Sequence, residues 1–210
     1  QYSRHVDRKI EQQLFPDRHG FSLFFICRTL KPELQDLSFM LHALAIRLRA
    51  DFLLIMLIRM LGEEKEALSC TAPFPFTDVP DWAECYAAYG YQKGYTNGVD
   101  ATTFGATMSA SAEMYTEFLL RALHYSSTAQ SDISTSPERA QAAGVLTAGE
   151  VSTLRGTAFL RADVVYLSYY ALETNISGGT ALSDALVSRG VFTADAYRFS
   201  RTMVTSARIR

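Results

Sequence analysis

The sequence predicts a mainly α-helical protein built from tandem helix–loop–helix repeats. Apolar residues recur at helical spacing in segments that are separated by polar loops containing glycine. The pattern also repeats itself: "LRAD" at 48–51 returns at 160–163, and residues 94–113 align without a gap with residues 144–163. Because one such unit cannot bury its own apolar face, at least three copies are expected to pack together.

The composition excludes several classes of protein. The chain has 210 residues, of which 48% are hydrophobic and 20% are charged, so it can bury a sizeable core. Its formal net charge of −2 is spread along the sequence, and no basic run favours nucleic acid or an anionic membrane. The longest apolar run, 52–58, is far shorter than the roughly 20 residues of a membrane span, so we expect no span.

The residue types that carry chemistry form no familiar catalytic or metal-binding motif. The four histidines lack metal-ligand spacing, and the chain has no nucleophile elbow, phosphate-binding loop or dinucleotide fingerprint. We therefore predict no metal, no cofactor and no enzymatic activity. Cys27, Cys70 and Cys85 are odd in number and lack CxxC spacing, so a Cys70–Cys85 bridge and three incidental thiols both stay open.

The clearest copy lies at 74–126, and local rules predict its elements. A Pro-Asp pair precedes a first helix over 82–93, along which aromatic and other apolar residues recur at helical spacing. Gly94 supplies a left-handed C-cap, after which a polar, extended loop is expected. The second helix is predicted over 112–123, with Glu113 in its first turn, where the helix dipole favours a carboxylate.

Matching the other copies to this one divides the chain into five segments, with 74–126 as the second copy. Residues 46–73 hold only the second helix of a first copy, 127–177 form a degenerate third copy, and 178–210 form a closing half-repeat and tail. We expect the closing segment to supply another first helix and turn that pack onto the third copy. Residues 1–45 match nothing in the repeat, so they are either a distinct preceding segment or a sequence altered by a frame change.

Several residues of the second copy follow one another in a specific order: Phe76, Asp78, Trp82-Ala83, Gly94, Gly98, Phe104 and Ala112-Glu113. This order resembles the S-layer homology domain. In that family a unit begins with F-x-D and a following W-A, passes a G…G turn and a Phe in the loop, and enters its second helix at a T-R-A-E motif. The likeness is moderate over 137–174 and covers only the second helix at 46–69.

The resemblance implies both a fold and a function. Proteins of this family anchor exported proteins to the bacterial cell wall, usually with three repeats around a pseudo-threefold axis and their second helices as a central bundle. Grooves between the repeats bind a secondary cell-wall polysaccharide, often one that bears a pyruvate ketal. The resemblance thus implies an extracellular, non-catalytic anchoring protein whose partner is this glycan.

The motif arginine is the residue that the resemblance places in each groove. An arginine beside the free N–H groups of a helix start is a good receptor for a carboxylate. Arg49 and Arg161 occupy this position, with Asp51 and Asp163 in place of the motif glutamate. The second copy has Ser111 there and loses the charge, so we expect one groove without binding.

The candidate polysaccharide-binding residues are Arg49, Arg161, Asp78, Trp82, Asp51, Asp163 and Glu113. Structural roles are the alternative. Large aromatic residues in amphipathic helices usually belong to the core, which applies to Trp82 as it does to Phe76, Phe104 and Tyr86. Asp78 is equally well placed to cap a turn, and the arginines could pair with local carboxylates.

The capping threonine of the motif is missing from every copy. Leu48, Ala110 and Leu160 stand at its position. We therefore expect no capping box at the start of any second helix, which would weaken each start by about 1 kcal/mol.

Two other functions stay open. A degenerate helical repeat could keep its packing, lose its glycan grooves and make protein contacts instead; the missing arginine at Ser111 favours this interpretation. The chain could also be the non-catalytic tether of a wall-associated hydrolase.

Overall fold

The computed structural model describes residues 48–126 and 132–203. Within these ranges 58% of the residues are helical and no strand is present, so the prediction of a mainly α-helical fold is confirmed. The predicted segment 1–45 lies outside the described residues. The helices in chain order are α4 (Ala50–Met60), α5 (Glu64–Leu68), the 3₁₀ helix η1 (Asp81–Ala83), α6 (Glu84–Gln92), α7 (Ala112–Ala122), the 3₁₀ helix η2 (Ile133–Thr135), α8 (Ser136–Ala142), α9 (Ala148–Gly156), α10 (Arg161–Glu173), α11 (Leu182–Ser188) and α12 (Ala194–Met203).

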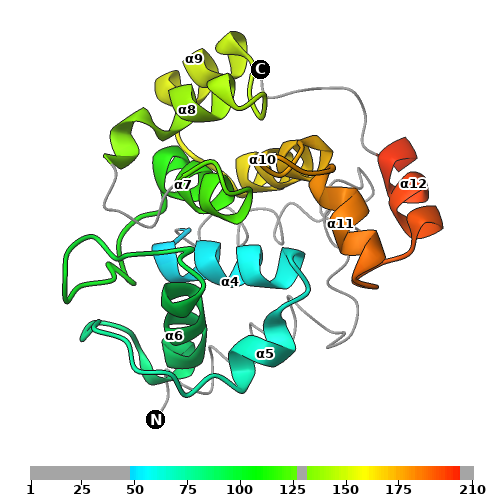
Figure 1. Cartoon of the computed structure of the whole chain (residues 1–210). Coiled ribbons are helices and arrows are strands. Elements are labelled where there is room, and N and C mark those ends of the chain that lie inside the picture. The colour runs from blue at the N-terminus through cyan, green and yellow to red at the C-terminus, as the bar shows by residue number, and fades with distance from the viewer. Residues whose placement is uncertain (1–47, 127–131, 204–210) are drawn as a thin grey trace, which may run out of the picture.

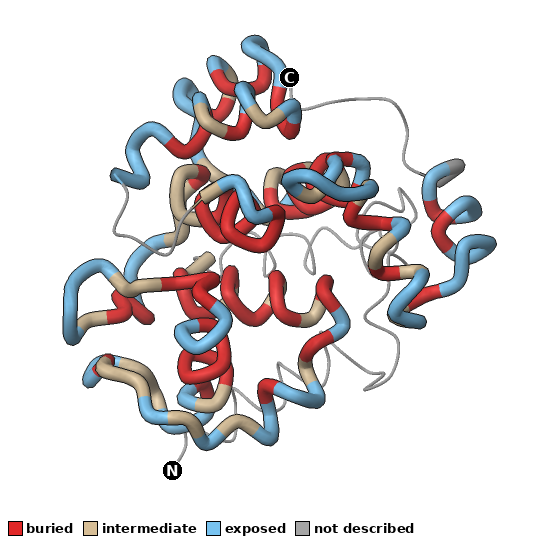
Figure 2. The backbone as a smooth tube through the Cα atoms, in the orientation of Figure 1, coloured by how far each residue is buried: buried red, intermediate tan, exposed pale blue. Residues whose placement is uncertain are grey.

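The helices α4, α7 and α10 form the centre of the fold, and each contacts the other two (Figure 1). Burial is concentrated on these helices (Figure 2). Their most buried side chains are mainly leucine, as expected for apolar faces that pack together: Leu53, Leu57, Ile58, Leu119, Leu120 and Leu167. The hydroxyl groups of Tyr115 and Ser168 form a buried hydrogen bond of 2.6 Å between α7 and α10. These are the predicted second helices, and their arrangement about a pseudo-threefold axis stays a prediction.

Each central helix also packs against the first helix of the following copy. Helix α4 contacts α6, α7 contacts α8, and α10 contacts α11. The crossing of α4 and α6 is close because Gly90 faces Leu54: a Cβ added at Gly90 would lie 2.8 Å from the leucine Cδ1. Each copy therefore depends on its neighbour for burial of its apolar face.

Glycine ends the first helices, as the sequence predicts. Gly94, Gly144 and Gly190 all follow a first helix directly and have φ values of +73°, +79° and +74°, in the left-handed region that favours glycine. The predicted C-cap at Gly94 is confirmed. In the same copy the second helix ends at Ala122, one residue before the predicted end.

The loop between the two helices differs between copies. In the third copy it contains α9, which begins with a capping box: Thr147 N–H donates to Glu150 at 2.6 Å, and Glu150 N–H donates to Thr147 Oγ1 at 3.4 Å. In the second copy the loop stays non-helical. The expectation of an extended loop is thus wrong for the third copy, because its sequence holds a local helix start.

The prediction that the second helices lack a capping box holds at α4 and α7, but side chains bond the starts of α7 and α10. Ser111 Oγ accepts a hydrogen bond of 3.2 Å from Met114 N–H and caps α7. At α10, the Asp163 carboxylate accepts from Leu160 N–H at 2.7 Å, which is the carboxylate half of a capping box. Of the three central helices, α4 is the one whose first turn receives neither kind of bond from a residue at its N-cap or N3 position. At α7 the cap is Ser111, the serine that replaces the motif arginine, and not the residue at the position of the motif threonine, Ala110.

The closing segment contacts both the third copy and the first. Helix α11 packs against α10, and the Arg189 guanidinium just beyond it donates to the Glu63 carboxylate at 3.0 Å. Gly62, in the turn after α4, lies against Val191: a Cβ added there would lie 2.6 Å from a valine methyl group. The C-terminal half-repeat therefore contacts both α10 and the turn that follows α4.

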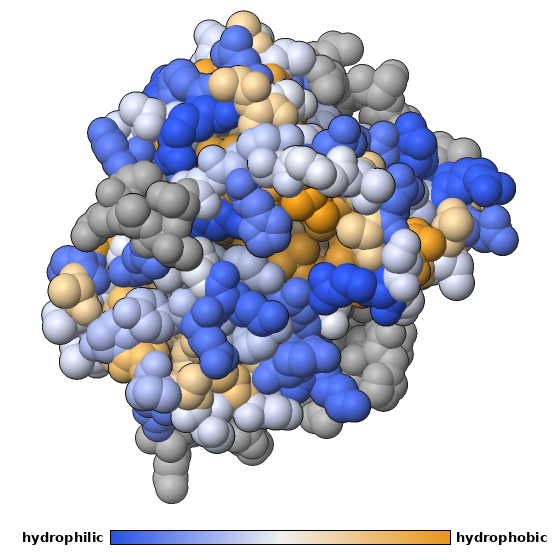
Figure 3. Space-filling view, viewed as in Figure 1, coloured by the Kyte–Doolittle hydropathy of each residue, from blue (hydrophilic) through white to orange (hydrophobic). Residues whose placement is uncertain are grey.

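Polar residues cover most of the face in Figure 3, and apolar residues gather near its middle. Over the described ranges, no helix is both long and apolar enough to cross a membrane. The same ranges contain no group of three or more His, Cys, Asp or Glu residues that could hold a metal ion. Cys70 and Cys85 are half-buried free thiols.

Candidate functional site

The start of α4 brings two predicted binding residues together. The Arg49 guanidinium forms an ion pair with the Asp51 carboxylate, and the distance from Arg49 Nε to Asp51 Oδ1 is 3.2 Å. Burial raises the pKa of Asp51 above its ordinary value of 3.8, although the Arg49 charge and the Phe52 N–H oppose this shift. The Asp51 side chain is buried, whereas 33% of the Arg49 side chain is exposed. Arg49 thus has the local carboxylate partner that the sequence allowed as an alternative.

The backbone N–H groups at this helix start are already hydrogen-bonded. Ala50 N–H donates to the Met108 carbonyl at 3.1 Å, and Asp51 N–H donates to the Ala106 carbonyl at 3.4 Å. Phe52 N–H donates to the Asp51 carboxylate at 2.9 Å. The loop of the second copy runs antiparallel to the start of α4 and supplies these carbonyls. The free N–H groups expected beside the motif arginine are therefore absent at α4, and a ligand there would bind to side chains.

Two aromatic side chains lie beside this ion pair. The Arg49 guanidinium lies over the Phe52 ring at 5.5 Å from its centroid, and the Phe52 and Trp82 ring centroids are 5.6 Å apart. Trp82 is 42% exposed, so the expectation that it belongs to the core is wrong. We call Arg49, Phe52 and Trp82 the Arg49–Trp82 surface. The other aromatic residues singled out in the sequence are buried as expected: Phe76, Phe104 and Tyr86.

Asp78 holds the loop that pairs with α4. Its carboxylate accepts hydrogen bonds from the N–H groups of Phe104 at 2.7 Å, Gly105 at 2.8 Å and Ala106 at 3.1 Å. Partial burial opposes ionisation, but these three donors outweigh it and hold the pKa of Asp78 below its ordinary value of 3.8. Asp78 is therefore a positioning residue, as the turn-capping alternative predicts, because it fixes the loop whose Ala106 carbonyl bonds the start of α4.

This arrangement predicts a pH dependence of stability. Because the pKa of Asp78 is lowered in the folded chain, its ionised form stabilises the fold fully above about pH 4, and this contribution is lost as the pH falls through the lowered value. Urea unfolding of the wild type and Asp78→Asn should show a constant difference between about pH 5 and pH 7 that shrinks towards about pH 3. A difference that stays constant down to about pH 3 would contradict this role.

The remaining predicted residues lie at the starts of the other two central helices. Arg161 is half-buried, burial lowers its pKa, and its side chain forms no hydrogen bond or ion pair with the described residues. Burial raises the pKa of Asp163, although the Leu160 N–H that it accepts opposes the shift. Glu113 lies 3.6 Å from Arg155 of α9. The structure thus brings Arg49, Asp51 and Trp82 close together. The other three candidates, Arg161, Asp163 and Glu113, lie at the starts of α10 and α7.

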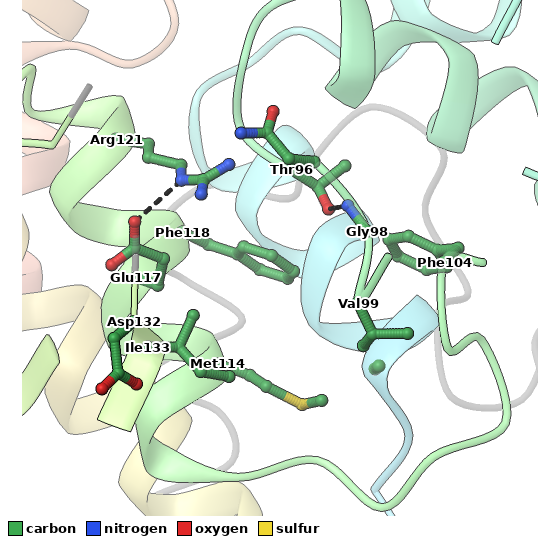
Figure 4. A pocket seen from close by; sticks show the side chains of 12 residues that line it. Thr96, Gly98, Val99, Phe104, Met114, Glu117, Phe118, Arg121, Asp132 and Ile133 are labelled. Atoms are coloured by element: carbon green, nitrogen blue, oxygen red, sulfur yellow. Dashed lines mark hydrogen bonds and ion pairs between the residues drawn. The ribbon is translucent and has the colours of Figure 1, made fainter. Parts of the chain in front are cut away.

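A cleft of about 370 Å³ opens beside α7, between that helix, the turn at 96–99 and the start of α4 (Figure 4). Its walls combine apolar and polar side chains. Met114 and Phe118 project from α7, Val99 and Phe104 come from the loop, and Ile133 comes from η2. Glu117 and Arg121 of α7 supply the charged part of its lining, and Asp132 lies near η2.

Glu117, which lines this cleft, is also the central acceptor of a buried polar network. Its carboxylate accepts from Arg121 Nε at 2.9 Å, from Ser136 Oγ at 2.8 Å and from Ser126 Oγ at 2.7 Å, and it forms an ion pair with Arg139. The residue is 2% exposed. The network therefore joins α7 to α8 of the next copy through one carboxylate and two guanidinium groups.

Arg121 has a buried nitrogen that the network does not satisfy. The residue is 7% exposed, and Nη1 is one of three buried side-chain polar atoms that have no hydrogen-bond partner in the described part of the chain. Figure 4 shows its guanidinium pointing from α7 towards the turn that carries Thr96. A buried N–H without an acceptor is costly, and such groups are normally paired with protein atoms or with ordered water.

No family model, curated protein or solved structure matches this chain. The likeness to S-layer homology repeats therefore rests on the motif positions in the sequence.

Sequence reasoning missed the network around Glu117 and Arg121. These residues lie four apart on one helix, a spacing that forms ion pairs on helix surfaces and usually indicates a solvated face. Here the following copy covers that face, because α8 packs against α7. Only the packing of one copy on the next distinguishes this buried pair from an exposed one.

Proposed function

We propose that this chain anchors an exported protein to the bacterial cell wall by binding a secondary cell-wall polysaccharide through the Arg49–Trp82 surface. The observation that supports this most is the exposed Trp82, whose ring packs at a tilt against Phe52 beside a guanidinium group. The apolar face of an exposed indole suits the C–H face of a sugar ring, and Arg49 can donate to sugar hydroxyl or carboxylate groups. Binding of this kind is non-covalent, requires no catalysis, and takes place outside the cell.

Arg161 offers a second cation for the same glycan. It has no ion-pair partner among the described residues, whereas Arg49 shares its charge with Asp51. Ser111 caps α7 in place of the third motif arginine, which leaves that helix start without a cation at this position. Two of the three helix starts therefore carry the proposed binding.

A second candidate function is a protein-contact module that has kept only the packing of the repeat. The hydrogen-bonded N–H groups at the start of α4 favour it, because they remove part of the anion receptor that the resemblance implies. A non-catalytic tether of a wall-associated hydrolase would share the glycan binding of the main proposal.

Co-sedimentation with Gram-positive sacculi tests the proposal. The purified chain is expected to pellet with sacculi that carry the secondary polysaccharide and to stay in solution when that polysaccharide has been stripped. Arg49→Ala with Trp82→Ala should reduce pelleting about tenfold, because an aromatic anchor and a charged donor are both lost. Arg161→Ala measures the contribution of the second cation.

Tyr125→Ala is the matched control, because Tyr125 is 39% exposed and lies outside the Arg49–Trp82 surface. It should pellet like the wild type. If the folded wild-type chain stays in solution with intact sacculi, the wall-anchoring proposal is wrong and the protein-contact module replaces it. Pelleting that is unchanged in the double variant would remove the Arg49–Trp82 surface as the binding site.

A further inference from the structure

We infer that Asn175 is a site of N-linked glycosylation, at which an oligosaccharide is transferred from a lipid-linked pyrophosphate donor to the side-chain amide. The tripeptide Asn175-Ile176-Ser177 has the N-x-S/T pattern of such sites, and its middle residue is not proline. Transfer of this kind takes place on exported proteins, so the inference rests on the export that the proposed function includes and not on binding to the wall.

The tripeptide begins a tight turn between α10 and α11 (Figure 1). Asn175 pairs with Ala181 in an isolated antiparallel bridge. Inside this bridge, Ile176 N–H donates to the Thr180 carbonyl at 2.9 Å. Backbone hydrogen bonds therefore close the turn, and its shape does not depend on the Asn175 side chain.

The two residues that a transferase must reach are accessible. Asn175 and Ser177 are both exposed, and so are the next three residues of the turn, 178–180. A Cβ built at Gly178 would meet nothing within 4 Å, so the described residues leave open space around the tip of the turn. An exposed turn of this kind is where a bulky glycan can be attached without displacing packed side chains.

The side chains that the reaction uses are also free of competing bonds. The Asn175 carboxamide and the Ser177 hydroxyl form no hydrogen bond with the described part of the chain. The backbone is held instead, because Ser177 N–H donates to the Leu123 carbonyl at 2.9 Å. The hydroxyl of the preceding Thr174, by contrast, donates to the Tyr170 carbonyl at 2.8 Å. The fold thus fixes the backbone of the tripeptide and leaves both of its polar side chains available.

The transfer forms one bond and breaks one. The Asn175 carboxamide nitrogen attacks the anomeric carbon of the first sugar, and the bond from that carbon to the pyrophosphate oxygen breaks. The nitrogen loses one proton and the lipid pyrophosphate leaves with the electron pair, so the step requires no oxidant or reductant. The Ser177 hydroxyl is both a donor and an acceptor, and it offers the transferase a group by which to hold the tripeptide.

Asn97 is the other asparagine of the chain and provides an internal control. It is half-buried, and Val99 stands two residues after it where a serine or threonine would be needed. We therefore expect Asn97 to stay unmodified under conditions that modify Asn175.

Incubation of the full chain with a purified oligosaccharyltransferase and a lipid-pyrophosphate-linked oligosaccharide tests the site. The intact mass should rise by one oligosaccharide, and peptide mapping should locate the glycan at Asn175. Asn175→Gln and Ser177→Ala should each abolish this increase, whereas Ser177→Thr keeps the hydroxyl and should keep the modification. All three changes lie at exposed positions, so the variants should unfold at the same urea concentration as the wild type.

A synthetic peptide of residues 170–181 measures the reactivity of the same sequence without the fold. Because the turn leaves both side chains free, the folded chain should be modified at a rate comparable with that of the peptide. A folded chain that stays unmodified, with or without modification of the peptide, would overturn the inference. So would a glycan that is still attached to Asn175→Gln, or full modification of Ser177→Ala. Sedimentation of the unmodified chain with sacculi is a separate measurement, so wall anchoring and glycan transfer can fail independently.

Discussion

Replacing Glu117 with alanine is expected to lower the free energy of unfolding by about 3–5 kcal/mol, the largest effect that we predict for a single change. The carboxylate is 2% exposed and accepts from Arg121, Arg139 and two serine hydroxyl groups. Its removal leaves Arg121 buried without its main partner, and an unpaired buried charge is much more costly than an exposed one. Urea unfolding should show a lower midpoint with an unchanged m-value.

Glu113→Ala provides the matched control on the same helix, four residues earlier. Glu113 is 3.6 Å from Arg155, and 27% of the Glu113 side chain is exposed. A partly exposed pair of this kind contributes little, so its loss should cost less than about 1 kcal/mol. If the two variants unfold at the same urea concentration, the network around Glu117 does not stabilise the contact between the second and third copies.

Gly98→Ala is expected to destabilise the fold by about 3 kcal/mol, the second largest effect, because two costs combine at one position. Gly98 has a φ of +72°, which strains any L side chain. A Cβ at this position would also lie 2.4 Å from the Thr103 carbonyl oxygen and 2.4 Å from the Phe76 ring. The carbonyl belongs to the backbone of the same tight loop, where Val99 N–H donates to it at 2.8 Å, so it cannot move away without loss.

Gly144→Ala separates the two costs. Gly144 has a similar φ of +79°, but a Cβ there would meet nothing within 4 Å. Its loss should therefore cost about 1 kcal/mol, the strain of the left-handed backbone alone. Thermal or urea unfolding of both variants measures the difference between them. Equal destabilisation by the two changes would show that the packing of Phe76 and Thr103 around Gly98 contributes nothing.

Part of the candidate site followed from the sequence. The repeat of "LRAD" led to Arg49 and Asp51, and the Pro-Asp start of the first helix led to Trp82. The structure places these residues together through Phe52, whose role the sequence did not indicate. The sequence also could not show that the loop of the second copy takes up the first N–H groups of α4, because that pairing joins residues more than 50 positions apart.

The sequence by itself determined the two helices of the second copy and the glycine that ends the first of them. Helical spacing of apolar residues and the left-handed preference of glycine are local properties, so the boundaries near Asp81, Gly94 and Ala112 could be predicted to within about one or two residues. The capping box at Thr147 is equally local, and it was missed only because the loop was expected to be alike in every copy.

The tertiary structure alone decided which side chains are exposed and which are shared between copies. Trp82 and Phe76 are both aromatic residues of one motif, yet one is 42% exposed and the other is 6% exposed. Asp78 and Glu117 both carry a carboxylate. Asp78 fixes a loop 26 residues further along the chain, whereas Glu117 forms an ion pair between the second and third copies. Burial and partners depend on which neighbouring copy covers a face, and that contact is a property of the packed array and not of any single repeat.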